Sequence, residues 1–292
     1  MSSQYDAIII GTGIIGGAIG LELARRGSRT LNVDKLPAAG YGSTSNTCAI
    51  IRFHDSTAEG VAMARESYYY WLDWPKHIGA ADEKGMAHYV NTGCVVIKEE
   101  ESNYYQHVMS LLDDLKIVYR ELDPKEFGEI LPFVDTRRFG PPVLAGDHRF
   151  CEPTGDSIAG AIYIPESGYI NDPQLACHNQ QRGCEECGGE FQFNAEVVEI
   201  LTRDGRVAGV KLADGSERFA PVVVNASGPH SFKINRMAGV EEGMRIRTRA
   251  LKREVCHVPA PKGVDFSLQG TMISDGDPGS YARPEVGNNL LV

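Results

Sequence analysis

The sequence lacks any apolar run long enough to span a membrane, and it has fewer basic than acidic residues. With 29 Lys and Arg against 39 Asp and Glu, its formal net charge is −10. This balance argues against a general nucleic-acid binder, because neutralising phosphates over a broad surface needs many cations. A signal peptide is not expected either, because the apolar run at residues 8–10 is short and a glycine turn follows it directly.

The sequence also lacks the paired cysteines of a disulfide-rich secreted protein. Its seven cysteines are odd in number and scattered over 292 residues, a length that allows a large core or two lobes. We interpret them as reduced thiols of a cytoplasmic protein. Cys184 and Cys187 have the spacing of a redox or zinc pair, but they also lie one turn apart on an expected helix over residues 173–187. Since no second pair stands at ligand spacing, we expect no metal site.

The most informative feature that is present is a Gly-x-Gly-x-x-Gly pattern formed by Gly11, Gly13 and Gly16. An apolar run at residues 7–10 precedes it, a helix is expected over residues 14–26, and Asp34 stands 18 residues past the third glycine. A glycine turn between strand and helix, with an acidic residue at this distance, is the dinucleotide-binding fingerprint. The alternative is a glycine-rich turn that binds nothing.

Each residue of the fingerprint has a physical role. Gly11 permits the tight turn, Gly13 lets a pyrophosphate approach the backbone, and Gly16 lets the helix pack close to the sheet. The helix directs its free N–H groups and positive dipole end at the phosphates. Asp34 can accept hydrogen bonds from a ribose hydroxyl. A Gly/Ser/Thr-rich loop follows from about residue 40 to residue 57, which suits ligand contact but is also compatible with an ordinary polar loop.

The remaining pattern predicts alternating helices and strands. We expect helices over residues 57–75 and 102–115, a short helix opened by Asp123, and a helix capped by Asp172. Strands are expected over residues 90–97, 118–122, 190–193, 195–200 and 206–212, with a turn at 214–215. A buried strand over residues 221–226 ends in a turn at Gly228. We also expect the mixed basic and apolar stretch at residues 245–253 to be a strand.

Together these segments resemble the FAD-dependent amine and amino-acid oxidoreductases of the glycine oxidase, sarcosine oxidase and D-amino-acid oxidase superfamily, over essentially the whole chain. The glycine motif, the strand ending near Gly228 and the order of elements carry the resemblance. Residues 42–52 align without a gap with the sarcosine oxidase pattern Gly-Ser-His-His-Gly-Asp-Thr-Arg-Ile-Ile-Arg. The resemblance implies an α/β fold. Residues 1–88 and 154–235 would form a Rossmann-type FAD-binding lobe, and residues 89–153 and 236–292 an α+β substrate lobe with an antiparallel sheet.

The resemblance implies FAD as the cofactor and oxidation of a C–N bond in a small amine or amino acid, with hydride transfer to the flavin. It places these residues around FAD: Gly11, Gly13, Ile14, Ile15 and Gly16 at the pyrophosphate; Asp34 and Lys35 at the ribose; Gly42, Ser43, Thr44, Asn46, Thr47, Cys48 and Ile50 on the flavin side; and Val197, Ala226 and Gly228 along the cofactor. Arg52 and Arg283 are candidate carboxylate anchors, because arginine binds carboxylates through two parallel hydrogen bonds. A structural role for each arginine is the open alternative, and catalytic residues stay unassigned.

The sequence departs from the sarcosine oxidases in ways that bear on the substrate. Their histidine aligns with Ser45, their first arginine with Ala49, and their oxygen-activating lysine near Leu291, so sarcosine is not the expected substrate. One alternative is a flavin-dependent 2-hydroxy-acid or glycerol-phosphate dehydrogenase, and another is a non-catalytic FAD-binding subunit. Relatives continue beyond the position of Val292. The chain could therefore be a fragment, a shortened protein or half of a split enzyme, with a second copy or a complementing chain covering its sheet edges.

Overall fold

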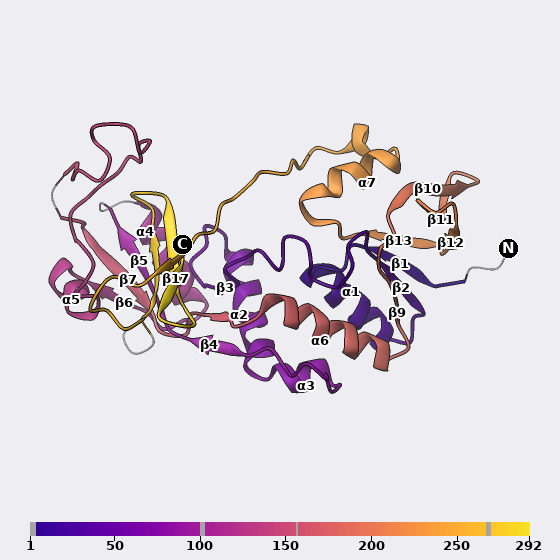
Figure 1. The fold of residues 1–292 in the computed structure, drawn as a ribbon, viewed down its shortest axis with the longest axis horizontal. Coiled ribbons are helices and arrows are strands. Elements are labelled where there is room, and N and C mark those ends of the chain that lie inside the picture. Colours follow the sequence, from indigo (N-terminus) through magenta and orange to yellow (C-terminus); the bar gives the residue numbers. More distant parts are fainter. Residues whose placement is uncertain (1–3, 100–102, 156, 267–269) are drawn as a thin grey trace. The chain divides into compact units, whose positions relative to one another are not determined.

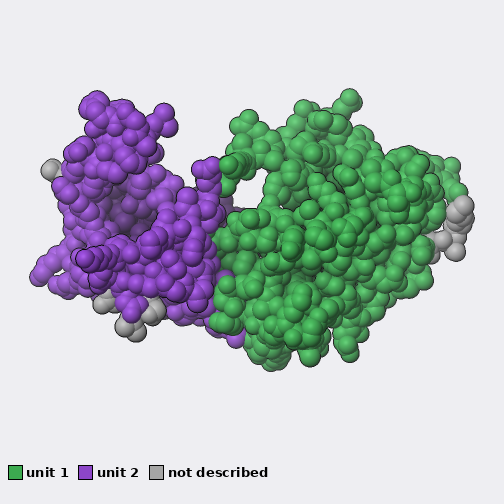
Figure 2. Space-filling model, in the orientation of Figure 1, with its two compact units in different colours: residues 1–49, 73–88, 171–253 green, residues 50–72, 89–170, 254–292 purple. Residues whose placement is uncertain are grey.

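The computed structural model describes residues 4–99, 103–155, 157–266 and 270–292. Contacts within the chain define two compact units, which Figure 2 shows in different colours. Unit 1 consists of Met1–Ala49, Asp73–His88 and Asn171–Arg253, and unit 2 of Ile50–Leu72, Tyr89–Ile170 and Glu254–Val292. The four-segment division into lobes that the sequence suggests stays a prediction.

Unit 1 is built on a four-stranded parallel sheet in the order β13-β1-β2-β9 (Figure 1). Its strands are β1 (Ala7–Ile10), β2 (Thr30–Val33), β9 (Glu190–Gln192) and β13 (Val222–Asn225). All residues of β1 and β2 are buried, as in parallel strands covered on both faces. Helices α1 (Ile14–Arg25) and α6 (Pro173–Glu186) pack against each other. The strand, turn, helix and second strand predicted at the N-terminus are confirmed.

A second, antiparallel sheet completes the core of unit 1. It contains β10 (Val197–Arg203), β11 (Arg206–Leu212) and β12 (Glu217–Phe219). The strand predicted at residues 206–212 and the turn predicted at 214–215 are confirmed, and the turn joins β11 to β12 in a hairpin. Val197 and Leu212 of this sheet share one hydrophobic core with Ile8 and Val33 of the parallel sheet. The other helices described in unit 1 are α3 (Trp74–Ile78) and α7 (Ser231–Met237), with short 3-10 turns η1 (Gly228–His230) and η2 (Glu241–Gly243).

Unit 2 contains a mixed sheet in the order β14-β17-β16-β15-β5-β7-β6. These strands are β5 (Cys94–Lys98), β6 (Arg120–Leu122), β7 (Gly160–Ile164), β14 (His257–Pro259), β15 (Met272–Asp275), β16 (Ser280–Glu285) and β17 (Asn289–Leu291). All neighbours are antiparallel except β15 and β5, which are parallel. A smaller antiparallel sheet joins β3 (Ile50–Ile51), β8 (Gly168–Ile170) and β4 (Tyr89–Asn91).

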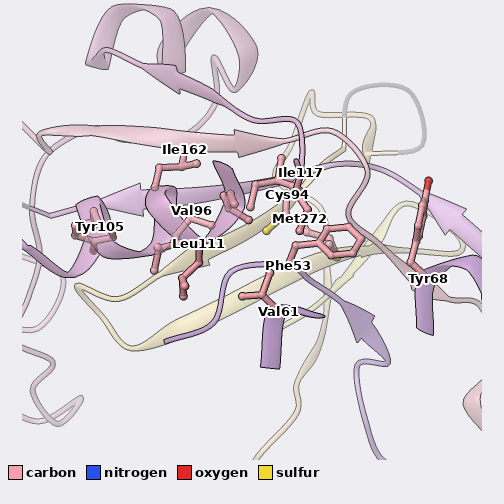
Figure 3. Close-up of a cluster of buried hydrophobic side chains, with 13 residues drawn as sticks. Phe53, Val61, Tyr68, Cys94, Val96, Tyr105, Leu111, Ile117, Ile162 and Met272 are labelled. Atoms are coloured by element: carbon pink, nitrogen blue, oxygen red, sulfur yellow. The ribbon is translucent and has the colours of Figure 1, made fainter. Parts of the chain in front are cut away.

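Helix α5 (Pro124–Ile130) packs in a separate core around the buried Phe127. Helices α2 (Ala58–Leu72) and α4 (Asn103–Asp114) pack against the sheet of unit 2 through the apolar core drawn in Figure 3. Phe53, Val61, Leu112 and Ile162 are fully buried in the core. Burial of an apolar side chain of this size contributes about 1.5–3 kcal/mol relative to exposure, so the core accounts for much of the stability of unit 2.

Two predicted helix caps are confirmed. Asp123 accepts hydrogen bonds from the backbone N–H groups of Lys125 and Glu126, and Glu126 reciprocates in a capping box. Asp172 accepts from the N–H of Leu175, with Pro173 in the first turn of α6. For the helix expected over residues 102–115, the predicted first residue, Ser102, lies outside the described residues. No helix in the described ranges is both long and apolar enough to cross a membrane.

Three sequence predictions were wrong in detail. The helix expected over residues 57–75 is interrupted at Asp73, after which α3 begins at Trp74 with Pro75 in its first turn. The strand expected over residues 90–97 is two strands, because Gly93 between them has φ +68°, which is not an extended conformation. A Cβ at this position would lie 2.6 Å from the ring of Tyr163, so only glycine fits there. The strand expected over residues 245–253 does not form. Ile246 is 79% exposed, so alternation alone predicts a strand where no core receives its apolar face.

Candidate functional site

The glycine turn of unit 1 is so tight that side chains are excluded from two of its positions. Gly11 has φ +100°, and a Cβ there would lie 2.5 Å from the carbonyl oxygen of Ala226. A Cβ on Gly16 would lie 1.8 Å from the carbonyl oxygen of Gly11. These contacts explain why helix α1 can begin directly against the ends of β1 and β13.

Two segments far from this turn in the sequence contact it, namely the Ser/Thr-rich loop and the turn after β13. The backbone N–H of Ile14 donates to Thr44 Oγ1 at 3.2 Å, which brings the Ser/Thr-rich loop to the start of α1. The N–H of Gly40 donates to the carbonyl of Thr12 at 3.0 Å. The N–H of Ala226 donates to the carbonyl of Ile10 at 2.9 Å, so the turn after β13 lies beside the first glycine. Parallel strands end at this edge, where ligands bind in open α/β sheets.

The start of α1 has the properties of an anion site. Its N-cap, Gly13, makes no side-chain capping bond, and no acidic residue lies in the first turn. The N–H groups of this turn and the helix dipole therefore favour a negatively charged group. A Cβ on Gly13 would lie 3.0 Å from Thr44 Oγ1, so a side chain at Gly13 would crowd Thr44 at the start of the helix. The residues present fit a dinucleotide pyrophosphate.

Asp34 lies at the end of β2 and is tied to the same turn. Its Oδ2 accepts hydrogen bonds from the backbone N–H of Thr12 at 2.8 Å and from Thr12 Oγ1 at 3.0 Å. Its Oδ1 accepts from the N–H of Leu36 at 3.0 Å. The carbonyl of Asp34 accepts from the N–H of Ala195, near the buried Val197. The sequence predicted the position of Asp34 but not the contribution of Thr12, because a side-chain contact across 22 residues leaves no local pattern.

The Ser/Thr-rich loop is ordered largely by its own hydrogen bonds. The side chains of Ser45 and Asn46 both donate to the carbonyl of Gly42, at 3.1 and 2.9 Å. Gly40 has φ +75°, and its missing Cβ would lie 2.9 Å from Cβ of Cys177 on α6. Of the remaining predicted cofactor residues, Lys35, Ser43, Thr47 and Gly228 are exposed, Cys48 is buried, and Ile50 belongs to unit 2.

The two candidate anchor arginines, both in unit 2, differ sharply in their surroundings. Arg283 is 2% exposed, pairs with Glu285 at 2.9 Å and donates to the carbonyl of Pro284 at 2.7 Å. Its guanidinium carbon lies 4.1 Å from the ring centroid of Tyr169, a cation–π contact. Arg52 is exposed, and its guanidinium donates to the carbonyl of His54 at 3.1 Å. A ligand can therefore approach Arg52, whereas the charge of Arg283 is already compensated.

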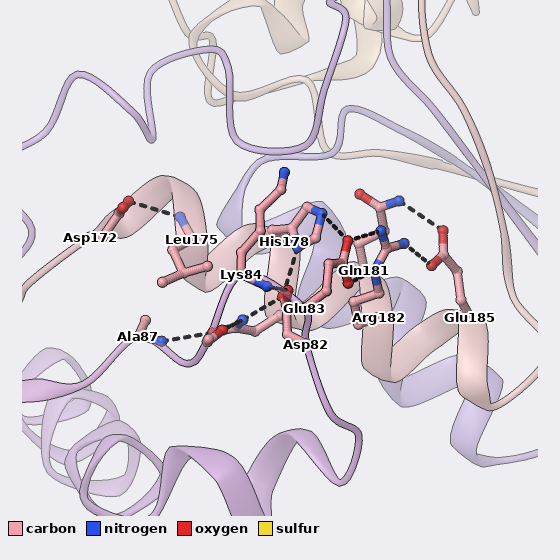
Figure 4. A network of polar contacts seen from close by, with 12 residues as sticks. Asp82, Glu83, Lys84, Ala87, Asp172, Leu175, His178, Gln181, Arg182 and Glu185 are labelled. Atoms are coloured by element: carbon pink, nitrogen blue, oxygen red, sulfur yellow. Dashed lines mark hydrogen bonds and ion pairs between the residues drawn. The ribbon is translucent and has the colours of Figure 1, made fainter.

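A polar network in unit 1 was not anticipated from the sequence (Figure 4). Asp82, Glu83 and His178 offer ligand atoms within 4.8 Å of one another. However, His178 Nδ1 lies 2.6 Å from Asp82, and Arg182 binds Glu83 at 2.6 Å. Hydrogen bonds from Arg182 lower the pKa of Glu83 to about 2. Because each member already has a protein partner, we assign the network a structural role, holding the segment after α3 against α6.

Asn179 is the centre of this network. Its Oδ1 accepts from Trp74 Nε1 at 3.0 Å and from the N–H of Ala87 at 2.9 Å. Its Nδ2 donates to Asp82 Oδ2 at 2.6 Å and to the carbonyl of Gly85 at 2.9 Å. A buried amide with all four of these bonds has only one satisfactory orientation. Asn179 thereby fixes a segment that contains no regular secondary structure.

The cysteine pair on α6 does not form a shared site. Cys184 is buried beside Thr30 and Asn32, and burial raises the pKa of its thiol. Cys187 is exposed at the end of the helix. None of the seven cysteines, all of which lie in the described residues, forms a disulfide.

The chain matches the family model described as FAD dependent oxidoreductase over residues 6–292. It is 25% identical over 307 residues to a glycine oxidase of Geobacillus kaustophilus, an alignment that covers 100% of this chain and 70% of that protein. It is 23% identical to a sarcosine oxidase subunit beta of Rhodobacter capsulatus, covering 92% of this chain and 60% of the subunit.

Among solved structures, the L-proline dehydrogenase of P. horikoshii superposes with a TM-score of 0.76 at 19% identity, covering 100% of this chain and 70% of that one. At that identity the likeness shows a shared fold. The family match extends over both units and includes the glycine turn, the Ser/Thr-rich loop and the strand before Ala226. The chain therefore belongs to the FAD dependent oxidoreductase (DAO) family and is an enzyme that uses FAD.

Proposed function

We propose that this enzyme oxidises a small amine or amino acid at the carbon beside the nitrogen. The observation that carries the proposal is the meeting of the glycine turn, Thr44 and Ala226 in a chain whose relatives include a glycine oxidase and a sarcosine oxidase subunit. When bound, FAD supplies the acceptor for a hydride equivalent, and the resulting imine is hydrolysed by water. The protein supplies binding, orientation and a preorganised field.

The cofactor residues expected from the sequence form a consistent set under this proposal. Gly11, Gly13, Ile14, Ile15 and Gly16 would hold the pyrophosphate through backbone N–H groups. Asp34 and Lys35 would bind the ribose, and the segment from Gly42 to Ile50 would contact the flavin side. Support comes from the N-terminus of α1, which begins at a residue without a side chain, Gly13, and favours negative charge.

We further propose that Arg52, rather than Arg283, anchors a substrate carboxylate. Arg52 is exposed, so its guanidinium is accessible for a two-bond contact with a carboxylate. Arg283 is buried and already paired with Glu285, so a second carboxylate would have to displace a buried partner. Arg283 is better explained as the internal counter-charge of β16.

The setting of the enzyme is also a proposal. The similarity to a sarcosine oxidase subunit supports the proposal that this chain associates with a partner chain or with a second copy of itself. A cytoplasmic location is consistent with seven cysteines that form no disulfide in the described residues. Size-exclusion chromatography with light scattering, on the purified chain and on protein recovered from its source, would measure the assembly.

Anaerobic reduction of bound FAD tests the reaction directly. The FAD-loaded protein is mixed in separate cuvettes with glycine, L-proline, sarcosine, lactate and glycerol 3-phosphate, and loss of the oxidised-flavin absorbance is followed. We expect reduction by an amino acid and none by sarcosine, lactate or glycerol 3-phosphate. Reduction by a hydroxy compound but by no amine would overturn the proposal and favour a flavin-dependent alcohol or hydroxy-acid dehydrogenase.

A further inference from the structure

Asp34 has an unusually complete set of hydrogen bonds for a residue expected to bind a ligand. An ionised carboxylate can accept about four hydrogen bonds, two on each oxygen. Both positions on Oδ2 are used by Thr12, through its N–H and its hydroxyl. One position on Oδ1 is used by the N–H of Leu36. One acceptor position on Oδ1 therefore remains for a ligand.

Thr12 is itself held in place. Its side chain and backbone are 1% exposed, and its carbonyl accepts the N–H of Gly40 from the Ser/Thr-rich loop. It stands between Gly11 and Gly13, whose conformations are set by the contacts of the turn. The Thr12 hydroxyl thus connects the rigid turn at the end of β1 to the carboxylate at the end of β2. A hydrogen bond to a charged acceptor is stronger than one between neutral groups, so this contact fixes the carboxylate plane.

We propose that Thr12 is a positioning residue for cofactor recognition. By occupying Oδ2, it leaves Oδ1 of Asp34 as the single acceptor for a ribose hydroxyl of the adenosine half of FAD. The inference rests on the proposed ribose-binding role of Asp34. It goes further because it assigns the choice of the accepting oxygen on Asp34 to the Thr12 hydroxyl, a group that does not contact the ribose. A fixed carboxylate at this point accepts a hydroxyl and repels a 2′-phosphate.

The test is a comparison of ligands that contain or lack the adenosine ribose. FAD, ADP and FMN are titrated by calorimetry into cofactor-free protein for the wild type and for Thr12→Val, Thr12→Ser and Asp34→Asn. Valine keeps the shape of threonine but removes the hydroxyl, whereas serine retains the hydroxyl. Thermal unfolding of each variant checks that the fold is preserved.

We expect Thr12→Val to raise the Kd for FAD and ADP about tenfold, to leave the Kd for FMN within about twofold, and Thr12→Ser to restore most of the affinity. Equal weakening of FAD and FMN, or unchanged FAD binding by Thr12→Val while Asp34→Asn weakens it, would refute the role of Thr12. Unchanged FAD binding by Asp34→Asn would instead refute the ribose site itself. The two failures are therefore distinguishable.

Discussion

Adding one methyl group at Gly16 should mainly lower stability, whereas adding one at Gly13 should mainly weaken cofactor binding. The Cβ of Gly16→Ala would lie 1.8 Å from the carbonyl oxygen of Gly11, a backbone atom that cannot rotate away. The start of α1 must therefore shift from the turn by more than 1 Å, roughly the deficit from normal contact. Overpacking of this kind costs about 1–3 kcal/mol or more. The gain of about 0.5–1 kcal/mol from replacing a helical glycine offsets only part of it.

Gly13→Ala meets a different neighbour. Its Cβ would lie 3.0 Å from Thr44 Oγ1, an atom of a side chain that can change rotamer. The cost is at most the Ile14–Thr44 hydrogen bond, about 0.5–1.5 kcal/mol. The methyl group would, however, stand where the proposed pyrophosphate approaches the backbone. We therefore expect near-normal stability and at least a tenfold loss of FAD affinity.

The assay combines urea unfolding of the cofactor-free protein, followed by far-ultraviolet circular dichroism, with calorimetric titration of FAD. Gly16→Ala should lower the free energy of unfolding by about 2 kcal/mol, whereas Gly13→Ala should lower it by no more than about 1.5 kcal/mol. Equal destabilisation by the two substitutions would refute the steric reasoning. Wild-type FAD affinity in Gly13→Ala would refute the proposed pyrophosphate site.

Further predictions concern charge in unit 2. Burial, followed by the charge of Arg52, lowers the pKa of His54 from 6.5 to about 3. As the pH falls through this range the unfolded chain binds the proton first, so His54 should lower the free energy of unfolding by up to about 1.4 kcal/mol per pH unit. In urea titrations from pH 6.5 to 3, His54→Phe should remove this contribution to the slope, and an unchanged slope would contradict it. Burial and then the charges of Asp277 and Glu99 raise the pKa of Asp275 to about 6. The ionised form of Asp275 is thus disfavoured in the folded protein. Asp275→Asn should therefore raise the free energy of unfolding at pH 8 by about 1–2 kcal/mol, after allowance for solvent screening, and leave it unchanged at pH 4. Equal effects at the two pH values would contradict this prediction. Arg52→Lys should raise KM for a carboxylate-bearing substrate about tenfold with little change in kcat, whereas an unchanged KM would exclude the anchor role.

The sequence could predict those parts of the fold and site that depend on short-range signals. A glycine turn between strand and helix, an aspartate before Pro173, and an apolar run such as β13 each specify local structure without distant partners. The Arg283–Glu285 pair was within reach of the same reasoning, because residues two apart on a strand share one face. The resemblance to the family instead suggested that Arg283 binds a substrate carboxylate.

The rest depended on contacts between distant segments. The four hydrogen bonds of Asn179 connect α6 to Trp74 and to the segment at Asp82, and nothing near residue 179 in the sequence indicates them. Residues 245–253 have the alternation of a strand, but a strand also requires a hydrogen-bonding neighbour and a buried face. Local pattern cannot report whether tertiary structure supplies either.

The absence of regular structure between η2 and β14 has a practical consequence. Residues 244–256 form no helix or strand, are all exposed, and include Arg245, Arg249 and Arg253, so trypsin should cut there first. Such a cut would sever the covalent link to the last segment of unit 2. Yet β15 in that segment pairs with β5, and Met272 lies in the core of Figure 3. The two pieces should therefore separate on a denaturing gel but migrate together in their native form, which makes this stretch a place to divide the gene for expression as two self-assembling halves.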